Sequence, residues 1–141
     1  MSLNNPEQKM SKSIPSGCLF LSDTPAEIKK KVMSAQTDSH KKIGYDPKRR
    51  KAVSNLIDIY AGFSGMTSAE VVKKYESANY AVFKSDLADL IAKSLEPFRE
   101  KRAKLMKDQN AVLKILENGS KRAGQIATLK LADAKKKAGL I

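Results

Sequence analysis

A polar loop near the start of the chain carries residues whose types and spacing could do chemistry. Lys9 and Lys12 stand three residues apart, and the hydroxyl residues Ser11 and Ser13 flank the second lysine. Ammonium groups can stabilise charge that develops on phosphate oxygens, and serine hydroxyls can donate hydrogen bonds to the same oxygens. The pattern favours a phosphate-binding loop, with a flexible, purely structural Lys/Ser loop as the alternative.

The charge of the chain points to a polyanionic partner. The 141 residues include 27 Lys and Arg against 15 Asp and Glu, for a formal net charge of +12. Such an excess repels itself, so nucleic acid is the first partner class to consider, with a generally basic solvated surface as the alternative. We predict RNA contacts at Lys48, Arg49, Arg50, Lys51, Arg99, Arg102, Lys121 and Arg122.

Other functional classes find little support in the composition. Cys18 is the one cysteine and His40 the one histidine, so neither a disulfide nor a metal site is expected. The absence of disulfides suits a reducing cytoplasm. The chain has neither an apolar run of membrane-spanning length nor a secretory segment at its start, and we expect no membrane partner.

The elements that would position the loop begin with a short strand. Residues Met1–Ser16 read as irregular, and the apolar run Leu19–Leu21 predicts one strand. Thr24 and Glu27 then form a capping box with Pro25 at the first helical position, which predicts a helix from Pro25 to about Ala35.

The remainder of the chain predicts helices. A turn-rich basic connection over residues 36–51 leads to a helix that ends near Gly65, and Thr67 with Glu70 forms a second capping box. A long helical pattern follows from Phe83, with a kink or break expected near Ser94–Glu96 because of Pro97. A last helical region spans about 110–138, where Thr128 could cap a second segment. The predicted fold is mostly α: a helical bundle of core-facing apolar stripes, preceded by an irregular loop and one short strand.

Several segments resemble one enzyme family. The sequence KMSKS at Lys9–Ser13 resembles the second signature of class I aminoacyl-tRNA synthetases. Further segments are similar to the tryptophanyl-tRNA synthetases, with the tyrosyl enzymes as the nearest alternative. They are Phe20–Asp23 with Pro25 and Glu27–Ile28, Tyr45–Pro47, Val53–Leu56, Phe83–Lys84, Leu95 with Pro97 and Arg99–Glu100, Gly119, Arg122–Ala123 and Thr128–Leu129. One departure is Ile14, where the family often has a polar residue.

The resemblance implies roles for the loop residues. Lys12 would be the main catalytic lysine, contacting the pyrophosphate portion of ATP, with Lys9 in support, and Ser11 and Ser13 would shape the loop. ATP with Mg²⁺ would be a substrate of the full-length enzyme, a tryptophan–tRNA ligase. No cofactor is expected to bind tightly to this chain alone. Residues 1–23 would end the catalytic domain, and residues 24–141 would form a helical domain that binds the anticodon arm of tRNA(Trp).

The resemblance also implies that the chain is a carboxy-terminal fragment. The amino-terminal half, with the HIGH-type signature and the amino-acid pocket, would be missing, so we expect no tRNA charging by this chain alone. The family forms homodimers mainly through the missing half, which allows a monomeric fragment. Two alternatives stay open: a stand-alone RNA-binding helical module without nucleotide chemistry, and a module that docks onto a separate amino-terminal half.

Overall fold

Two helices begin at the capping boxes that the sequence predicts. In the computed structural model, which describes residues 1–40 and 42–140, α1 spans Pro25–Ser34 and α3 spans Ser68–Lys74. Thr24 accepts from the backbone N–H of Glu27 at 3.3 Å, and the Glu27 carboxylate accepts from the Thr24 N–H at 2.7 Å. Thr67 and Glu70 repeat this exchange. Each box satisfies two N–H groups that a helix start otherwise leaves without partners.

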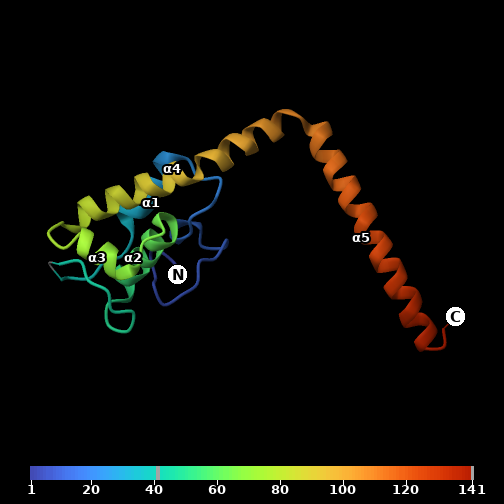
Figure 1. Cartoon of the computed structure of the whole chain (residues 1–141), viewed down its shortest axis with the longest axis horizontal. Coiled ribbons are helices and arrows are strands. Elements are labelled where there is room, and N and C mark those ends of the chain that lie inside the picture. Colours follow the sequence, from blue (N-terminus) through green and yellow to red (C-terminus); the bar gives the residue numbers. More distant parts are fainter. Residues whose placement is uncertain (41, 141) are drawn as a thin grey trace. The chain divides into compact units, whose positions relative to one another are not determined.

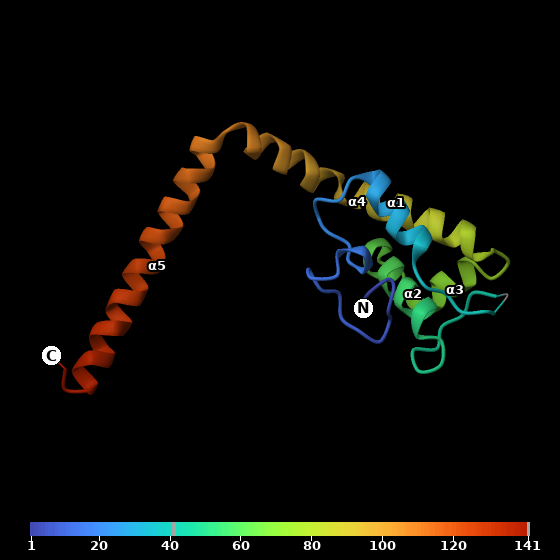
Figure 2. The same cartoon turned by 180° about the vertical axis from the view of Figure 1, so that it is seen from behind.

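The core forms around α2, which spans Lys51–Ser64. Its residues 53–57 are all buried, and it ends at Gly65, whose φ of 74° is the left-handed conformation that glycine adopts without strain. Helix α4, which spans Tyr80–Lys107, supplies the other large part of the core. Figures 1 and 2 show α1, α2, α3 and the first part of α4 together. The largest fully buried side chains are Phe83, Ile28, Leu56, Ile57, Leu87 and Ile91.

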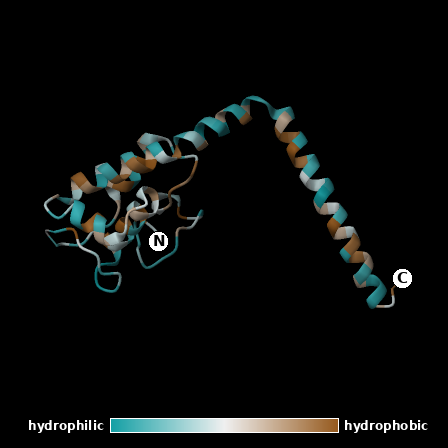
Figure 3. Cartoon of the chain, viewed as in Figure 1, coloured by the Kyte–Doolittle hydropathy of each residue, from teal (hydrophilic) through white to brown (hydrophobic). Residues whose placement is uncertain are grey.

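The chain divides into two compact units, Met1–Arg99 and Glu100–Ile141. The mostly α class is confirmed, but the predicted core-facing stripes are buried only in the first unit. Helix α5 spans Gln109–Lys137 and contains no buried residue. Figure 3 shows hydrophobic positions along α5, and Leu116 and Leu129 are 62% and 74% exposed. No helix in the described ranges is both long enough and apolar enough to cross a membrane.

Three local predictions differ from the structure. The short strand at Leu19–Leu21 is not confirmed: residues 18–20 have no regular structure and a turn follows, because the described chain offers no strand for them to pair with. Of the kink or break predicted before Pro97, the break is wrong, since α4 continues through the proline. Thr128 caps no second segment, because α5 is continuous from its N-cap, Asp108, which accepts from the N–H of Ala111.

A buried lysine joins the end of α1 to α4. Lys84 is 8% exposed, and its ammonium donates to the carbonyl oxygens of Met33 at 3.1 Å and Ala35 at 2.6 Å. Burial lowers the pKa of Lys84. A cation near a helix C-terminus is favoured by the helix dipole and satisfies carbonyls that lack intrahelical partners. Lys84 therefore closes α1 and holds it against α4.

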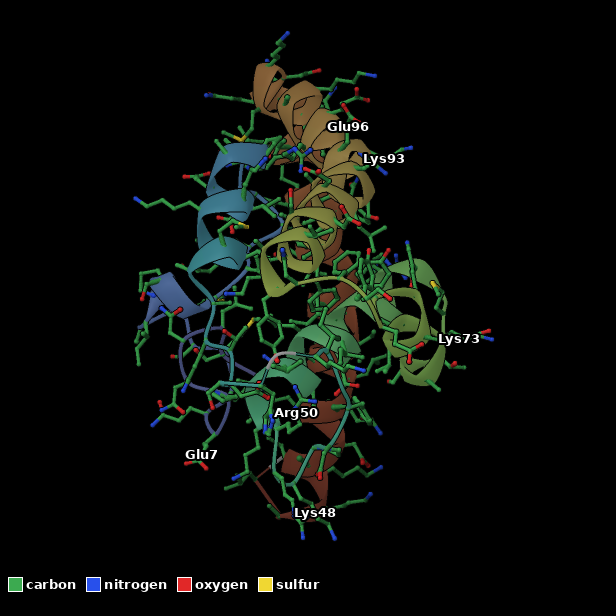
Figure 4. The ribbon with its side chains drawn as sticks, turned by 90° about the vertical axis from the view of Figure 1, so that its left-hand side faces the viewer. Glu7, Lys48, Arg50, Lys73, Lys93 and Glu96 are labelled. Atoms are coloured by element: carbon green, nitrogen blue, oxygen red, sulfur yellow. The ribbon has the colours of Figure 1, made fainter. Side chains whose placement is uncertain are left out.

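We expect Lys84→Met to destabilise the protein by about 1–3 kcal/mol, because two carbonyl groups at the end of α1 lose their charged donor. Denaturant unfolding followed by circular dichroism measures the change. Lys93→Met is the matched control, since Lys93 is an exposed lysine of the same helix (Figure 4). Equal stability of the two variants would contradict the assigned role of Lys84.

Candidate nucleotide loop and RNA-binding segment

The loop that carries Lys9–Ser13 is closed at its base by backbone hydrogen bonds. Leu3 donates to the carbonyl of Gly17 at 2.9 Å, and Ser2 donates to that of Gln8 at 2.8 Å. Gly17 lies so close to Ser2 that a Cβ at Gly17 would collide with the Ser2 hydroxyl. The carbonyl of Leu3 also accepts from Gln36 N–H at 2.8 Å, which ties the base to the segment after α1. The two ends of the loop are thus held side by side on the core.

The tip of the loop presents its lysines to solvent. Lys9, Ser11, Lys12 and Ser13 are all exposed, whereas Met10 is half-buried and packs against the core. The Ser11 hydroxyl accepts from the Ser13 N–H at 3.3 Å, and the Ser11 carbonyl accepts from Ile14 N–H at 3.0 Å. Neither lysine has an ion-pair partner among the described residues. The arrangement leaves two ammonium groups able to approach a phosphate chain.

The basic segment Lys48–Lys51 runs from a turn into the first residue of α2, and hydrogen bonds of Asp46 order the turn. The carboxylate of Asp46 accepts from the N–H groups of Lys48 and Arg49, each at 3.0 Å. The N–H of Asp46 in turn donates to the hydroxyl of Ser54, a buried residue of α2, at 2.9 Å. This is an Asx turn anchored on the next helix, and it places the four basic side chains at the start of α2.

Arg50 is engaged inside the protein rather than free. Its guanidinium donates to the carboxylate of Asp38 through Nε at 2.7 Å and Nη2 at 3.2 Å. Nη2 also donates to the carbonyl of Lys42 at 2.8 Å and to the hydroxyl of Tyr80 at 2.9 Å. The Tyr80 hydroxyl donates to Asp38 at 2.6 Å. This network, the Asp38–Arg50–Tyr80 cluster, joins the connection after α1 to the starts of α2 and α4.

The cluster changes the acidity of its members. Burial by itself would raise the pKa of Asp38, but hydrogen bonds from Arg50 and Tyr80 outweigh it and lower the pKa to about 2. Burial and the neighbouring Asp38 carboxylate raise the pKa of Tyr80 to about 12. The hydrogen bond to Asp38 raises the pKa of Arg50. Near neutral pH the cluster therefore holds a carboxylate, a guanidinium and a neutral phenol.

A cavity of about 480 Å³ adjoins the basic segment, a size typical of small-ligand sites. Its wall holds four cationic side chains, of which two are engaged. Arg50 binds Asp38, and Lys51 pairs with Glu7 at 2.6 Å. The side chains of Lys48 and Arg49 are exposed and have no ion-pair partner in the described ranges. Figure 4 labels three residues of the lining, Glu7, Lys48 and Arg50. The lining residues are Asn5, Pro6, Glu7, Gln36, Thr37, Asp38, Lys48, Arg49, Arg50, Lys51 and Ala52.

The other predicted RNA contacts do not join this cavity. Arg99 is half-buried at the end of the first unit, and its Nη2 donates to the Ala92 carbonyl of its own helix at 2.7 Å. Arg102, Lys121 and Arg122 are exposed residues of the second unit. The described residues contain no group of three His, Cys, Asp or Glu side chains placed to hold a metal ion.

Sequence reasoning missed the residues that organise the site. Asp38 and Tyr80 lie 12 and 30 residues from Arg50, and no local pattern links them to it. Ser54 and Asn55 were recognised only as part of a similar segment. A signal for them did exist, because two adjacent polar residues interrupt the apolar run of α2, and a buried polar group needs a partner.

Comparison with known proteins identifies the relatives of the chain. The model of the family described as tRNA synthetases class I (W and Y) matches residues 1–96. The tryptophan–tRNA ligase of Listeria monocytogenes is 39% identical over 99% of this chain and 43% of its own length. The tryptophan–tRNA ligase of Clostridium perfringens is also 39% identical, over 100% of this chain and 43% of its own length. The solved structure of tryptophanyl-tRNA synthetase from Mycoplasma pneumoniae is similar to this chain with a TM-score of 0.83 and a sequence identity of 26%. The match covers 100% of this chain and 43% of the Mycoplasma pneumoniae chain. The chain thus spans about 43% of the length of these relatives.

We expect the Asp38–Arg50–Tyr80 cluster to make stability depend on acid pH. Because the folded-state pKa of Asp38 lies below its unfolded value, the stabilisation is present above about pH 4 and is lost as pH falls toward 2. Comparing the native protein with Asp38→Asn by denaturant unfolding should show a difference of roughly 1–2 kcal/mol at pH 7. That difference should shrink between pH 4 and pH 2, and a difference independent of pH would exclude an ionised Asp38 as its source.

Proposed function

Because the chain belongs to the family of class I tRNA synthetases for tryptophan and tyrosine, we propose that it is part of a tryptophan–tRNA ligase. In this proposal it supplies the nucleotide loop and a tRNA-binding surface. The observation that carries the proposal is the exposed Lys9–Ser13 loop, held at its base on a helical core. The identity of 39% to two tryptophan–tRNA ligases supports tryptophan rather than tyrosine.

The chemistry proposed for the loop is charge stabilisation during amino-acid activation. The carboxylate of tryptophan attacks the α-phosphorus of ATP, the bond to the bridging oxygen breaks, and pyrophosphate leaves with the electron pair. Lys12 contacts the departing pyrophosphate and Lys9 assists, so negative charge meets ammonium groups where it develops. Ser11 and Ser13 order the loop. Mg²⁺ accompanies the nucleotide, and the loop contributes cations rather than metal ligands.

The RNA-binding part of the proposal centres on Lys48 and Arg49. Both are exposed and free of ion pairs in the described chain, unlike Arg50 and Lys51. Arginine can stack on an unpaired base or contact a phosphate through two N–H groups, and lysine supplies point charge. Arg99, Arg102, Lys121 and Arg122 remain further proposed contacts to tRNA(Trp). In this scheme residues 1–23 end the catalytic domain and residues 24–141 bind RNA.

The proposed protein partner is the remaining part of the enzyme. The relatives are more than twice as long as this chain, and α5 has an apolar side with no cover among the described residues. Leu113, Leu116 and Ile126 are 55%, 62% and 65% exposed. An uncovered surface of this kind commonly marks an interface. We assign it to the remaining amino-terminal half, and we propose that the complete enzyme is a homodimer in the cytoplasm.

We expect Lys12→Ala to abolish activity that the native chain restores. The chain is combined with the separately purified amino-terminal half of the Listeria monocytogenes ligase, and tryptophan-dependent exchange of pyrophosphate into ATP is measured. The native chain should support exchange, and Lys12→Ala should lower it by about 100-fold or more, because one preorganised charge partner of the leaving group is lost.

The controls separate chemistry from assembly. Lys93→Ala, an exposed lysine on α4, should leave exchange unchanged. Leu116→Asp should weaken assembly, so that more of the chain is needed for half-maximal exchange. An unchanged rate for Lys12→Ala would refute the role of Lys12, and no exchange with the native chain at any concentration would favour the stand-alone RNA-binding module.

We expect Lys48→Ala with Arg49→Ala to weaken binding of tRNA(Trp) and to reduce its salt dependence. Each phosphate contact removed should lower the slope of log affinity against log salt by about 0.7–0.9. Filter binding over a series of KCl concentrations measures both effects. Lys73→Ala with Lys93→Ala, two exposed lysines of α3 and α4 (Figure 4), removes the same number of charges and is the matched control. A double variant that behaves like this control would rule out the basic segment as an RNA contact.

A further inference from the structure

Asn55 is a buried polar residue in the most buried stretch of α2. Its exposed fraction is 9%, and its neighbours in the helix include Leu56 and Ile57, which are at most 1% exposed. A buried side-chain amide costs free energy unless its donor and acceptor both find partners. Both partners of Asn55 come from residues 1 and 2, the segment that leads into the nucleotide loop.

The amide of Asn55 bonds to residue 1 through both of its polar atoms. Its Oδ1 accepts from the amino-terminal ammonium of Met1 at 2.9 Å, and its Nδ2 donates to the Met1 carbonyl at 3.2 Å. Nδ2 also approaches the Ser2 carbonyl at 3.5 Å. The next residues, Ser2 and Leu3, are buried and make the backbone bonds that close the base of the loop. One side chain of α2 thus fixes the chain immediately before the loop.

Ser54, the residue next to Asn55, fixes the basic segment on α2 in a similar way. The Ser54 hydroxyl accepts from Asp46 N–H at 2.9 Å, and Asp46 orders Lys48 and Arg49. Among the described residues, the other side-chain hydrogen bond between loop and helix is the ion pair of Glu7 with Lys51, whose side chains are 67% and 48% exposed. Such exposed pairs contribute little. The buried amide of Asn55 is therefore the main side-chain anchor of the loop on α2.

We propose that Asn55 is a positioning residue of the synthetase reaction: its amide holds Met1 and Ser2 on α2 and thereby sets where Lys9 and Lys12 stand. The proposal rests on the proposed nucleotide role of the loop. Asn55 touches no substrate and acts through the loop. Ser54 positions the basic segment in parallel, so one turn of α2 anchors both candidate sites.

Site-resolved amide hydrogen exchange of the purified chain tests the anchor without any ligand. Asn55→Leu removes the donor and the acceptor at similar size, and Asn55→Ala removes both together with most of the side chain. In each variant the amides of Leu3 and Gln36 should exchange about tenfold faster relative to that of Leu87 in the core, because one buried hydrogen bond is lost locally. Ser54→Ala is the matched control. It should speed the amide exchange of Lys48 and Arg49 and leave the exchange rate of the Leu3 amide unchanged. Equal acceleration of all amides, or none at Leu3, would overturn the proposal.

Pyrophosphate exchange with the amino-terminal half tests the functional consequence. Asn55→Leu should lower kcat by about tenfold and leave the KM for tryptophan unchanged, because the proposed amino-acid pocket lies on the other half. A change confined to KM, or an unchanged kcat, would overturn the positioning role. If the native chain supports no exchange at all, the proposed function fails, while the amide exchange result still decides whether Asn55 anchors the loop.

Discussion

The hydrogen bonds of Ser54 and Asn55 connect the packed core to both segments that could carry chemistry. Helix α2 buries residues 53–57 in succession, so its two polar side chains cannot reach water and must bond to protein. Their partners are Asp46 and Met1. Core packing holds the helix in place, so a segment that is hydrogen-bonded to the helix is held in place as well. The nucleotide loop and the basic segment are therefore exposed at their tips and fixed at their bases.

Charge is divided between structure and surface within the same region. Arg50 lies in the Asp38–Arg50–Tyr80 cluster, where a carboxylate, a carbonyl and a phenol surround the guanidinium. Lys84 is buried against the end of α1. Both cations make intramolecular hydrogen bonds that stabilise the fold. The net charge of +12 therefore includes cations that are buried or hydrogen-bonded within the fold. Only the exposed cations can contact a polyanion directly.

The second unit poses a different physical problem. A long helix with several exposed leucines gains little from its apolar side chains when nothing covers them. The relatives extend well beyond the length of this chain, and the proposed amino-terminal partner would supply a cover for this stripe. The sequence predicts core packing for this stripe, whereas its residues are exposed in the structure.

Local sequence determined the starts of α1 and α3, the helical class and the Lys9–Ser13 loop, because capping boxes, helical periodicity and short motifs depend on residues a few positions apart. It misjudged Leu19–Leu21 and Pro97, where the outcome depends on a pairing partner or on the surrounding helix. Only the tertiary structure decided which cations are free and what holds the loop. Asn55 bonds a residue 54 positions away, and Arg50 bonds residues 12 and 30 positions away. Such contacts arise only when the core brings distant segments together, and they leave no periodic trace in the sequence.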